Sequence, residues 1–279
     1  MMNHPTQRIL VNGVGLNVLD VGQGPAVLLV HGFPDDHEVW RHQIEALVTA
    51  GYRVIAPDTR GCGESDIPTN VKDYHIDTLV ADLIALLDAL KLPSVRLVGH
   101  DWGAAICWRL CMLHPDRIER YVALSVGHLS AYARGPLEQK LKGWYVLFFQ
   151  LRGVAEAAIK AGNWRLLRWF TAFPSEAQRW IRQLSRPGRL TAGLNYYRAN
   201  MGMILPRRLP QVKVPVLGIY STGDRFLAEA QMIDSARYVE ARWQYERVNG
   251  ASHWLQLDAP ETINTLLIQY LGSDQGHAG

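Results

Sequence analysis

The chain has 279 residues, a formal net charge of +3 at neutral pH and apolar side chains at 48% of its positions. This length suits one large domain, or a core with an insertion, and the composition is that of an ordinary soluble globular protein. The small net charge gives no indication of nucleic-acid binding. No run of about 18 uncharged apolar residues occurs, so the sequence predicts no membrane span.

The three cysteines, Cys62, Cys107 and Cys111, do not form the pattern of a disulfide framework. The first ten residues lack the basic and apolar regions of a signal peptide. Together these features lead us to expect a cytoplasmic protein with reduced cysteines. The sequence leaves open whether the chain forms a homodimer.

The first part of the chain alternates short apolar runs with amphipathic segments. The run AVLLV is continuously apolar, which is typical of a strand covered on both faces. The expected strands cover residues 26–30, 52–58, 95–100 and 118–125. The expected helices cover residues 78–92 and 103–115. This alternation predicts a mostly parallel sheet with helices on both faces.

From residue 126 to about residue 212 the sequence shows helical, aromatic-rich pieces and no convincing strand. The strand pattern returns at residues 214–224 and 243–248, and a last helix is expected at 259–271. We therefore expect an α/β core in two parts, residues 1–125 and 213–279, interrupted by a helical cap at residues 126–212. Such an insertion at the carboxyl edge of a sheet would roof a pocket.

The stretch VRLVGHDWGAA reads as a strand, a sharp turn and a helix, with Asp101 at the apex of the turn. Gly99 and Gly103 flank the apex in the form G-x-D-x-G, whose serine version is the nucleophile elbow. Glycines are needed because a side chain at either flank would collide with the neighbouring strand or helix. The turn places Asp101 at a helix N-terminus, which stabilises an anion. Taken alone, the motif also fits a helix-capping aspartate.

Two further residues are candidates for the other members of a catalytic triad. Proteins with a nucleophile elbow have the nucleophile, the acid and the histidine in this order along the chain. Asp224 comes just beyond the expected strand in VLGIYSTGD, and His253 lies in the loop after WQYERV. Each residue alone also fits an ordinary turn or loop position. Together with Asp101, at three predicted strand ends, they predict a catalytic triad.

An aspartate at the apex changes the chemistry of the elbow. Its carboxylate is anionic at neutral pH and can displace a leaving group from a saturated carbon, which forms an ester. His253, oriented by Asp224, would then activate a water to hydrolyse this ester at the carboxyl carbon of Asp101. The expected oxyanion donors are the main-chain N–H groups of Trp102 and of Phe33, in the loop after the first buried strand.

The motifs HGFPD, DTRGCGESD, GHDWGA, STGD and SHW occur in this order along nearly the whole chain. In order and spacing they resemble the α/β-hydrolase-fold epoxide hydrolases and their close relatives, the haloalkane dehalogenases. The resemblance implies an α/β-hydrolase fold with a helical cap over the sheet. It also implies a hydrolase that uses no metal and no organic cofactor.

The leaving group distinguishes the two relatives. An opened epoxide is an alkoxide, which needs a proton or a strong hydrogen bond, and a tyrosine hydroxyl can supply one. The segments GWYVLFFQLRGVAEA and GLNYYRANM are similar to those that carry the two ring-opening tyrosines of epoxide hydrolases, which implies this role for Tyr145 and Tyr197. Tyr196 would point about 100° away on a helix. Val146 stands where the family often has glutamine, which bears on pocket shape.

Four alternatives to an epoxide hydrolase can be compared with the motifs. A haloalkane dehalogenase with the same triad typically has asparagine where this chain has Phe33, and a fluoroacetate dehalogenase would have arginine where it has Trp102. An ester hydrolase is disfavoured because Asp101 replaces serine, and a non-catalytic member of the fold would lack the nucleophile or the histidine. The sequence therefore predicts that a small apolar epoxide and water are converted to a vicinal diol, with haloalkane dehalogenation as the alternative.

Overall fold

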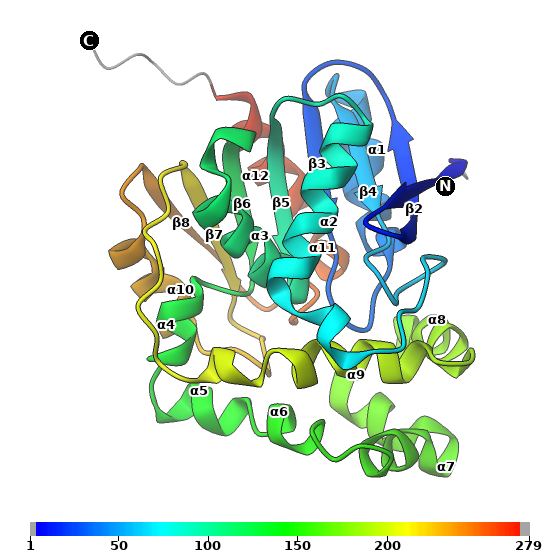
Figure 1. Ribbon diagram of the computed structural model, residues 1–279. Coiled ribbons are helices and arrows are strands. Elements are labelled where there is room, and N and C mark those ends of the chain that lie inside the picture. Colours follow the sequence, from blue (N-terminus) through cyan, green and yellow to red (C-terminus); the bar gives the residue numbers. More distant parts are fainter. Residues whose placement is uncertain (1–3, 274–279) are drawn as a thin grey trace.

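An eight-stranded sheet in the order β1-β2-β4-β3-β5-β6-β7-β8 forms the centre of the structure, a computed structural model that describes residues 4–273 (Figure 1). The strands are β1 (Thr6–Val11), β2 (Val14–Val21), β3 (Ala26–Val30), β4 (Arg53–Pro57), β5 (Val95–His100), β6 (Ile118–Leu124), β7 (Val216–Ser221) and β8 (Trp243–Val248). All pairs from β4 to β8 are parallel, whereas β2 pairs antiparallel with both β1 and β4. The predicted fold class is confirmed.

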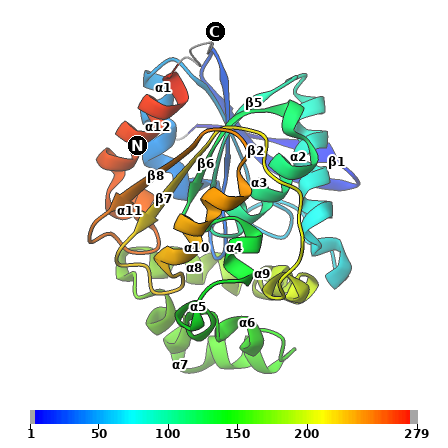
Figure 2. The same ribbon diagram turned by 90° about the vertical axis from the view of Figure 1, so that its left-hand side faces the viewer.

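Helices cover both faces of the sheet. The α-helices outside the β6–β7 connection are α1 (Arg41–Thr49), α2 (Ile76–Ala89), α3 (Trp102–Leu113), α10 (Glu229–Ile233), α11 (Leu255–Asp258) and α12 (Pro260–Gly272). The short 3-10 helices are η1 (His37–Trp40), η2 (Val71–Tyr74), η3 (Pro115–Arg117), η4 (Met201–Ile204) and η5 (Asp234–Tyr238). Figure 2 shows α1 and α12 on one face and α2 and α3 on the other.

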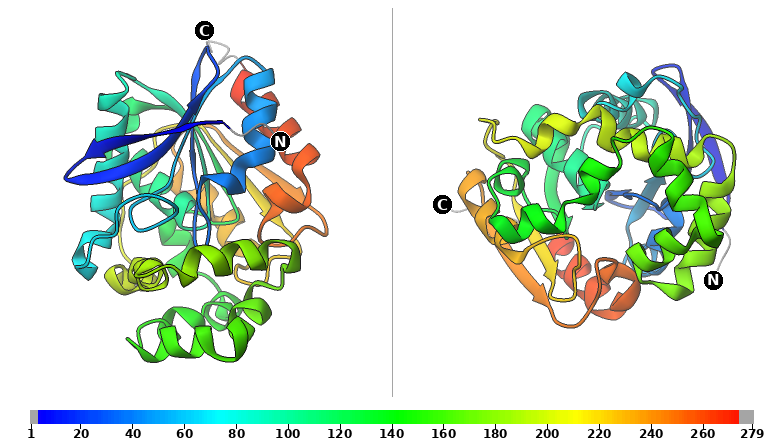
Figure 3. Two further views of the ribbon diagram at one scale, coloured as in Figure 1. Left: turned by 90° about the vertical axis from the view of Figure 1, so that its right-hand side faces the viewer. Right: turned by 90° about the horizontal axis from the view of Figure 1, so that it is seen from below.

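The connection between β6 and β7 contains helices and no strand. Its α-helices are α4 (Leu129–Ala133), α5 (Leu137–Lys142), α6 (Tyr145–Phe148), α7 (Val154–Thr171), α8 (Pro174–Ser185) and α9 (Arg189–Ala199). They lie together at one end of the sheet, next to the carboxyl ends of the parallel strands (Figure 3). The boundaries of a separate cap at residues 126 and 212 remain a prediction.

The sequence pattern found the parallel strands and missed the first hairpin. Strands β1 and β2 at the start of the chain were not expected, although the residues Asn12 and Gly13 between them both have positive φ, as a tight turn requires. The expected strand at 214–224 is shorter, because the chain leaves the sheet after Ser221 and turns towards Asp224. The expected helix at 103–115 ends as α3 at Leu113, two residues before Pro115.

No helix among residues 4–273 combines the length and the apolar character needed to cross a membrane. The three cysteines are unpaired thiols, and Cys107 and Cys111 are buried on α3. The cytoplasmic location stays a prediction.

Candidate active site

The turn between β5 and α3 holds Asp101 in a strained backbone conformation, with φ 53° and ψ −124°. Positive φ is unusual for a residue with a side chain and is found where the surrounding structure enforces it. A Cβ on Gly103 would overlap the main-chain oxygen of Val30, and one on Gly99 would lie 2.8 Å from the Cα of Ala104. Both flanking positions therefore require glycine, as the motif predicts.

The carboxylate of Asp101 faces donors from two other strand ends. The main-chain N–H of Phe33, in the loop after β3, donates to Asp101 Oδ1 at 2.9 Å. Oδ2 lies 3.4 Å from Nε2 of His253. Burial favours the neutral acid, but the hydrogen bond and charge of His253 outweigh burial, so that the pKa of Asp101 is lowered. Asp101 is therefore an anion at neutral pH.

His253 lies between two carboxylates. Its Nδ1 donates to Asp224 Oδ2 at 2.8 Å, on the side opposite to Asp101. Asp224 is held in turn, because its Oδ1 accepts from the main-chain N–H groups of Phe226 at 2.7 Å and Leu227 at 3.0 Å. Burial lowers the pKa of His253, but the two carboxylates outweigh it and raise the pKa to about 10. The structure thus brings together the three residues of the predicted triad.

The loop that carries His253 is fixed through its main chain. The main-chain oxygen of His253 accepts from His100 Nε2 at 2.9 Å and from Ser125 Oγ at 3.1 Å. His100 is the last residue of β5, and Ser125 is the first residue after β6. The predicted second oxyanion donor, the N–H of Trp102, is in the first turn of α3, where main-chain N–H groups have no partner within the helix.

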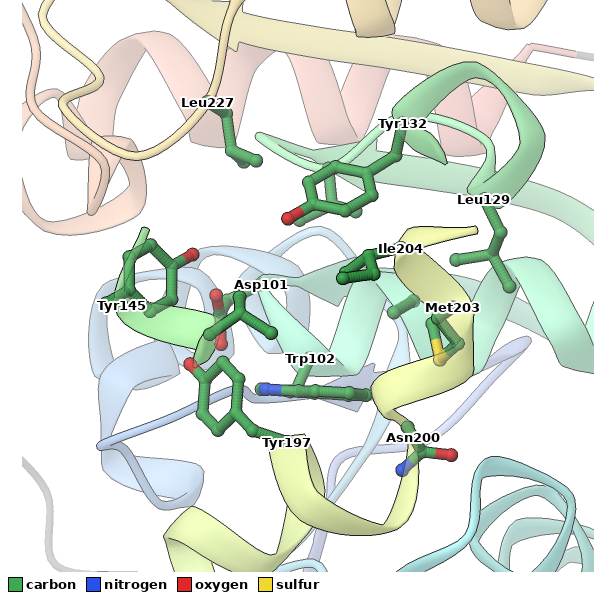
Figure 4. Close-up of a pocket in the computed structure, with 13 residues that line it drawn as sticks. Asp101, Trp102, Leu129, Tyr132, Tyr145, Tyr197, Asn200, Met203, Ile204 and Leu227 are labelled. Atoms are coloured by element: carbon green, nitrogen blue, oxygen red, sulfur yellow. The ribbon is translucent and has the colours of Figure 1, made fainter. Parts of the chain in front are cut away.

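Tyr145, at the start of α6, and Tyr197, on α9, line one cavity with Asp101 (Figure 4). Their rings lie 5.9 Å apart at an angle of 81°, and each side chain is less than a tenth exposed. Burial, reinforced by the charge of Asp101, raises the pKa of both hydroxyls well above the ordinary value, so both remain protonated donors. Tyr196 points elsewhere, since its hydroxyl donates to the main-chain oxygen of Arg60 and also forms a hydrogen bond with the hydroxyl of Thr59.

The rest of this cavity is mainly apolar. Its volume is about 70 Å³. Apolar and aromatic side chains form the walls: Trp102, Ala105, Val126, Leu129, Val146, Met203, Ile204 and Leu227. Val146, at the position where epoxide hydrolases often have glutamine, makes this wall less polar. An apolar pocket with a few convergent polar groups is the usual form of a small-molecule site.

Asp35 connects the helical segment to the His253 loop, a role that the sequence did not reveal. Its two oxygens accept from the indole N–H of Trp180 on α8, at 2.8 Å, and of Trp254, at 2.9 Å. Burial raises the pKa of Asp35 to about 6, although Arg179 and the two indoles oppose this. In the sequence, the one indication of this contact was Trp254, the tryptophan directly after His253.

One group of side chains within residues 4–273 has the spacing of metal ligands: Asp36, His37 and Asp58. These three side chains already form hydrogen bonds and ion pairs within the protein. Asp58 Oδ1 accepts from His37 Nδ1 at 2.7 Å, and Asp36 forms an ion pair with Arg179 on α8. The group therefore serves as a polar brace between loops. The sequence-based expectation that the hydrolase uses no metal remains an expectation.

Residues 25–260 match the family of the alpha/beta hydrolase fold. The chain is 34% identical over 280 residues to the AB hydrolase superfamily protein YfhM of Bacillus subtilis, with 95% of this chain and 97% of the relative covered. It is 32% identical over 320 residues to Epoxide hydrolase A of Mycobacterium tuberculosis, with 97% and 98% covered.

Solved structures are similar over the same extent. The crystal structure of Epoxide Hydrolase A from Mycobacterium thermoresistibile has a TM-score of 0.82 at 30% identity and covers 97% of this chain and 99% of its own. A mutant epoxide hydrolase from Bacillus megaterium has a TM-score of 0.86 at 27% identity, with 96% of this chain and 100% of its own covered. The likeness therefore includes the helical segment between β6 and β7.

Proposed function

The chain belongs to the epoxide hydrolases of the α/β-hydrolase fold, and from this premise we propose that it adds water to an epoxide through a covalent ester of Asp101. One observation carries the proposal: an anionic carboxylate at the elbow lies between an imidazole and two protonated tyrosine hydroxyls in an apolar cavity. This combination matches the needs of epoxide opening, a nucleophile on one side of the ring and proton donors at its oxygen.

In the first step, one oxygen of Asp101 attacks a ring carbon and the carbon–oxygen bond of the epoxide breaks. Tyr145 and Tyr197 donate hydrogen bonds to the departing oxygen, one to each of its two lone pairs. The high pKa of both hydroxyls keeps them protonated until charge develops on that oxygen. The products are an ester and an alkoxide that takes up a proton.

His253 accounts for that proton. With a pKa of about 10 it is an imidazolium in the resting site, paired with the Asp101 carboxylate. Alkylation turns Asp101 into a neutral ester and removes one of the two charges that raise the pKa of His253. The imidazolium can then release its proton to the alkoxide by way of water or tyrosine, which leaves a neutral imidazole.

In the second step, neutral His253 takes a proton from a water that attacks the carboxyl carbon of Asp101. The N–H of Phe33 already contacts Oδ1 and, with the N–H of Trp102, would stabilise the oxyanion. The collapse of this intermediate releases the diol and restores the carboxylate and the imidazolium. The sum of both steps is epoxide plus water to vicinal diol, with every proton accounted for.

Haloalkane dehalogenation, the alternative drawn from the sequence, uses the same first displacement. A halide leaves without a proton, so it gives the two buried hydroxyls no task, and Phe33 offers no side-chain donor to it. Incubation with styrene oxide, 1,2-epoxyoctane and 1-bromooctane distinguishes the two, because diol release without bromide release is expected.

A single-turnover reaction in water labelled with heavy oxygen tests the ester mechanism. With enzyme in excess over epoxide, the first diol should contain unlabelled oxygen from Asp101, and the label should appear in the peptide that contains Asp101. Under multiple turnover the diol should become labelled. Label in the diol of the first turnover would show direct attack by water and would exclude the ester. Asp101→Asn provides the inactive control.

A further inference from the structure

A third tyrosine hydroxyl reaches the cavity from α4. Tyr132 lines the cavity together with Asp101, Tyr145 and Tyr197, and Figure 4 shows its hydroxyl directed towards the side where Asp101 and Tyr145 lie. The hydroxyl lies beside Gly143, where an added Cβ would be 3.3 Å from it. The packing of α4 against the chain before α6 thus determines where this donor sits.

The other polar side chains of the lining are already accounted for. Asn200 accepts from the N–H of Ile76 at 2.9 Å and donates to the main-chain oxygens of Tyr74 at 2.9 Å and Tyr196 at 2.8 Å. Asp101 and the tyrosines on α6 and α9 have their tasks in ring opening. The indole of Trp102 lies beside Tyr197. Tyr132 is therefore the tyrosine of the described lining whose hydroxyl has neither a protein partner nor a step in ring opening.

The Tyr132 hydroxyl is a neutral donor in a largely apolar wall. Burial, together with the charge of Asp101, raises its pKa to about 12. An epoxide oxygen has two lone pairs, and the pair of tyrosines on α6 and α9 occupies both. The hydroxyl of Tyr132, a third donor, would therefore bind a different oxygen atom of the substrate. A ligand oxygen that accepts from this hydroxyl gains one hydrogen bond that an apolar ligand of the same shape cannot form.

We propose that Tyr132 is a specificity-determining residue that donates a hydrogen bond to an ether or hydroxyl oxygen in the substituent next to the epoxide ring. The proposal rests on the proposed function and names its substrate class, epoxides with an oxygen close to the ring. Pure hydrocarbon epoxides are still opened by Asp101, but they leave the Tyr132 hydroxyl without a partner.

Two substrates of the same length test the proposal. Butyl glycidyl ether and 1,2-epoxyoctane differ in one atom of the chain, an ether oxygen in place of a methylene group. We compare kcat/KM for both substrates in the wild-type protein, Tyr132→Phe and Gly143→Ala, which adds a methyl group beside the same hydroxyl. Tyr52→Phe, at the opposite end of the strands just before β4, is the matched control.

The Tyr132→Phe protein should lose about 5- to 10-fold in kcat/KM for the ether, as expected for one hydrogen bond, and nothing for 1,2-epoxyoctane. Gly143→Ala should shift the ratio of the two substrates in the same direction, and the control should not change it. Equal losses on both substrates, or no change on either, would overturn the proposal. A wild-type protein that opens neither epoxide would instead reject the proposed function, and this proposal with it.

Discussion

Replacement of Asp224 by asparagine is the change whose effect the site geometry defines most closely. Oδ1 of Asp224 accepts from two main-chain N–H groups, at 2.7 and 3.0 Å, whereas Oδ2 faces Nδ1 of His253 at 2.8 Å. An asparagine must keep its oxygen towards the two main-chain donors, so its amide N–H₂ group faces the imidazole. Nδ1 would then have to accept, which places the proton of neutral His253 on Nε2, the nitrogen needed to activate water.

The size of the effect follows from the electrostatics of His253. A pKa raised from 6.5 to about 10 corresponds to roughly 5 kcal/mol of preference for the imidazolium. Asp224 and Asp101 share this preference, and Asp224 is the nearer, at 2.8 Å against 3.4 Å. We assign it about 3 kcal/mol, a factor of roughly 10², and the wrong tautomer adds to this, so kcat should fall by about 10³ to 10⁴.

Rapid quenching and mass spectrometry of the intact protein measure this effect. In Asp224→Asn the first step should slow far less than the second, so an ester of Asp101 accumulates to nearly one per active site. Asp116→Asn, at an exposed position in η3, controls for the loss of one carboxylate. If the variant loses kcat without accumulating an ester, or if both steps slow equally, Asp224 does not act through the base in hydrolysis.

Three further predictions use other contacts of the site and the helical segment. Tyr145→Phe and Tyr197→Phe should each lower the rate of ester formation about 10- to 100-fold, with a larger loss in the double variant, measured by single-turnover kinetics with styrene oxide. Arg198→Met breaks the partly buried ion pair between Arg198 and Glu156, 2.7 Å long. It should lower the free energy of unfolding by about 2 kcal/mol in urea titrations, and the double variant Arg198→Met with Glu156→Gln should lose less, because it leaves no unpaired charge. Asp35 has a folded pKa of about 6, above its ordinary 3.8, so the folded protein binds more protons than the unfolded chain around these values. Its free energy of unfolding should therefore fall by roughly 2 kcal/mol as the pH rises from 4 to 6. Asp35→Asn should remove this slope, and an unchanged slope would contradict the assignment.

That the three residues of the proposed triad lie together could be predicted from the sequence, because each follows a strand end. Asp101, Asp224 and His253 each follow a parallel strand, and the carboxyl ends of such strands meet at one edge of the sheet. A strand can be recognised locally from a short apolar run between turn residues. The location of these residues therefore needed only the order of the elements, not their packing.

Tyr132 and Asp35 could not be predicted in this way. Tyr132 lies on a helix of five residues, too short for a periodic pattern to show which side chain faces the cavity. Asp35 acts through indoles at positions 180 and 254, and nothing local in the sequence pairs residues so far apart. The first hairpin was missed for a related reason: β1 pairs only with β2 and its residues are mostly exposed, so it lacks the apolar run of a buried strand.

The proposed chemistry divides the charged and the neutral groups between two parts of the chain. The carboxylates and the imidazole come from loops of the sheet, where main-chain N–H groups such as that of Phe33 hold them in place. The hydroxyls come from the segment between β6 and β7, where a change of side chain leaves the sheet hydrogen bonds intact. Substrate preference can therefore change through residues such as Val146 and Tyr132 without disturbing the ester chemistry. This separation is why Tyr132→Phe should alter the ratio of two substrates, whereas Asp224→Asn should slow the hydrolysis of every ester that Asp101 forms.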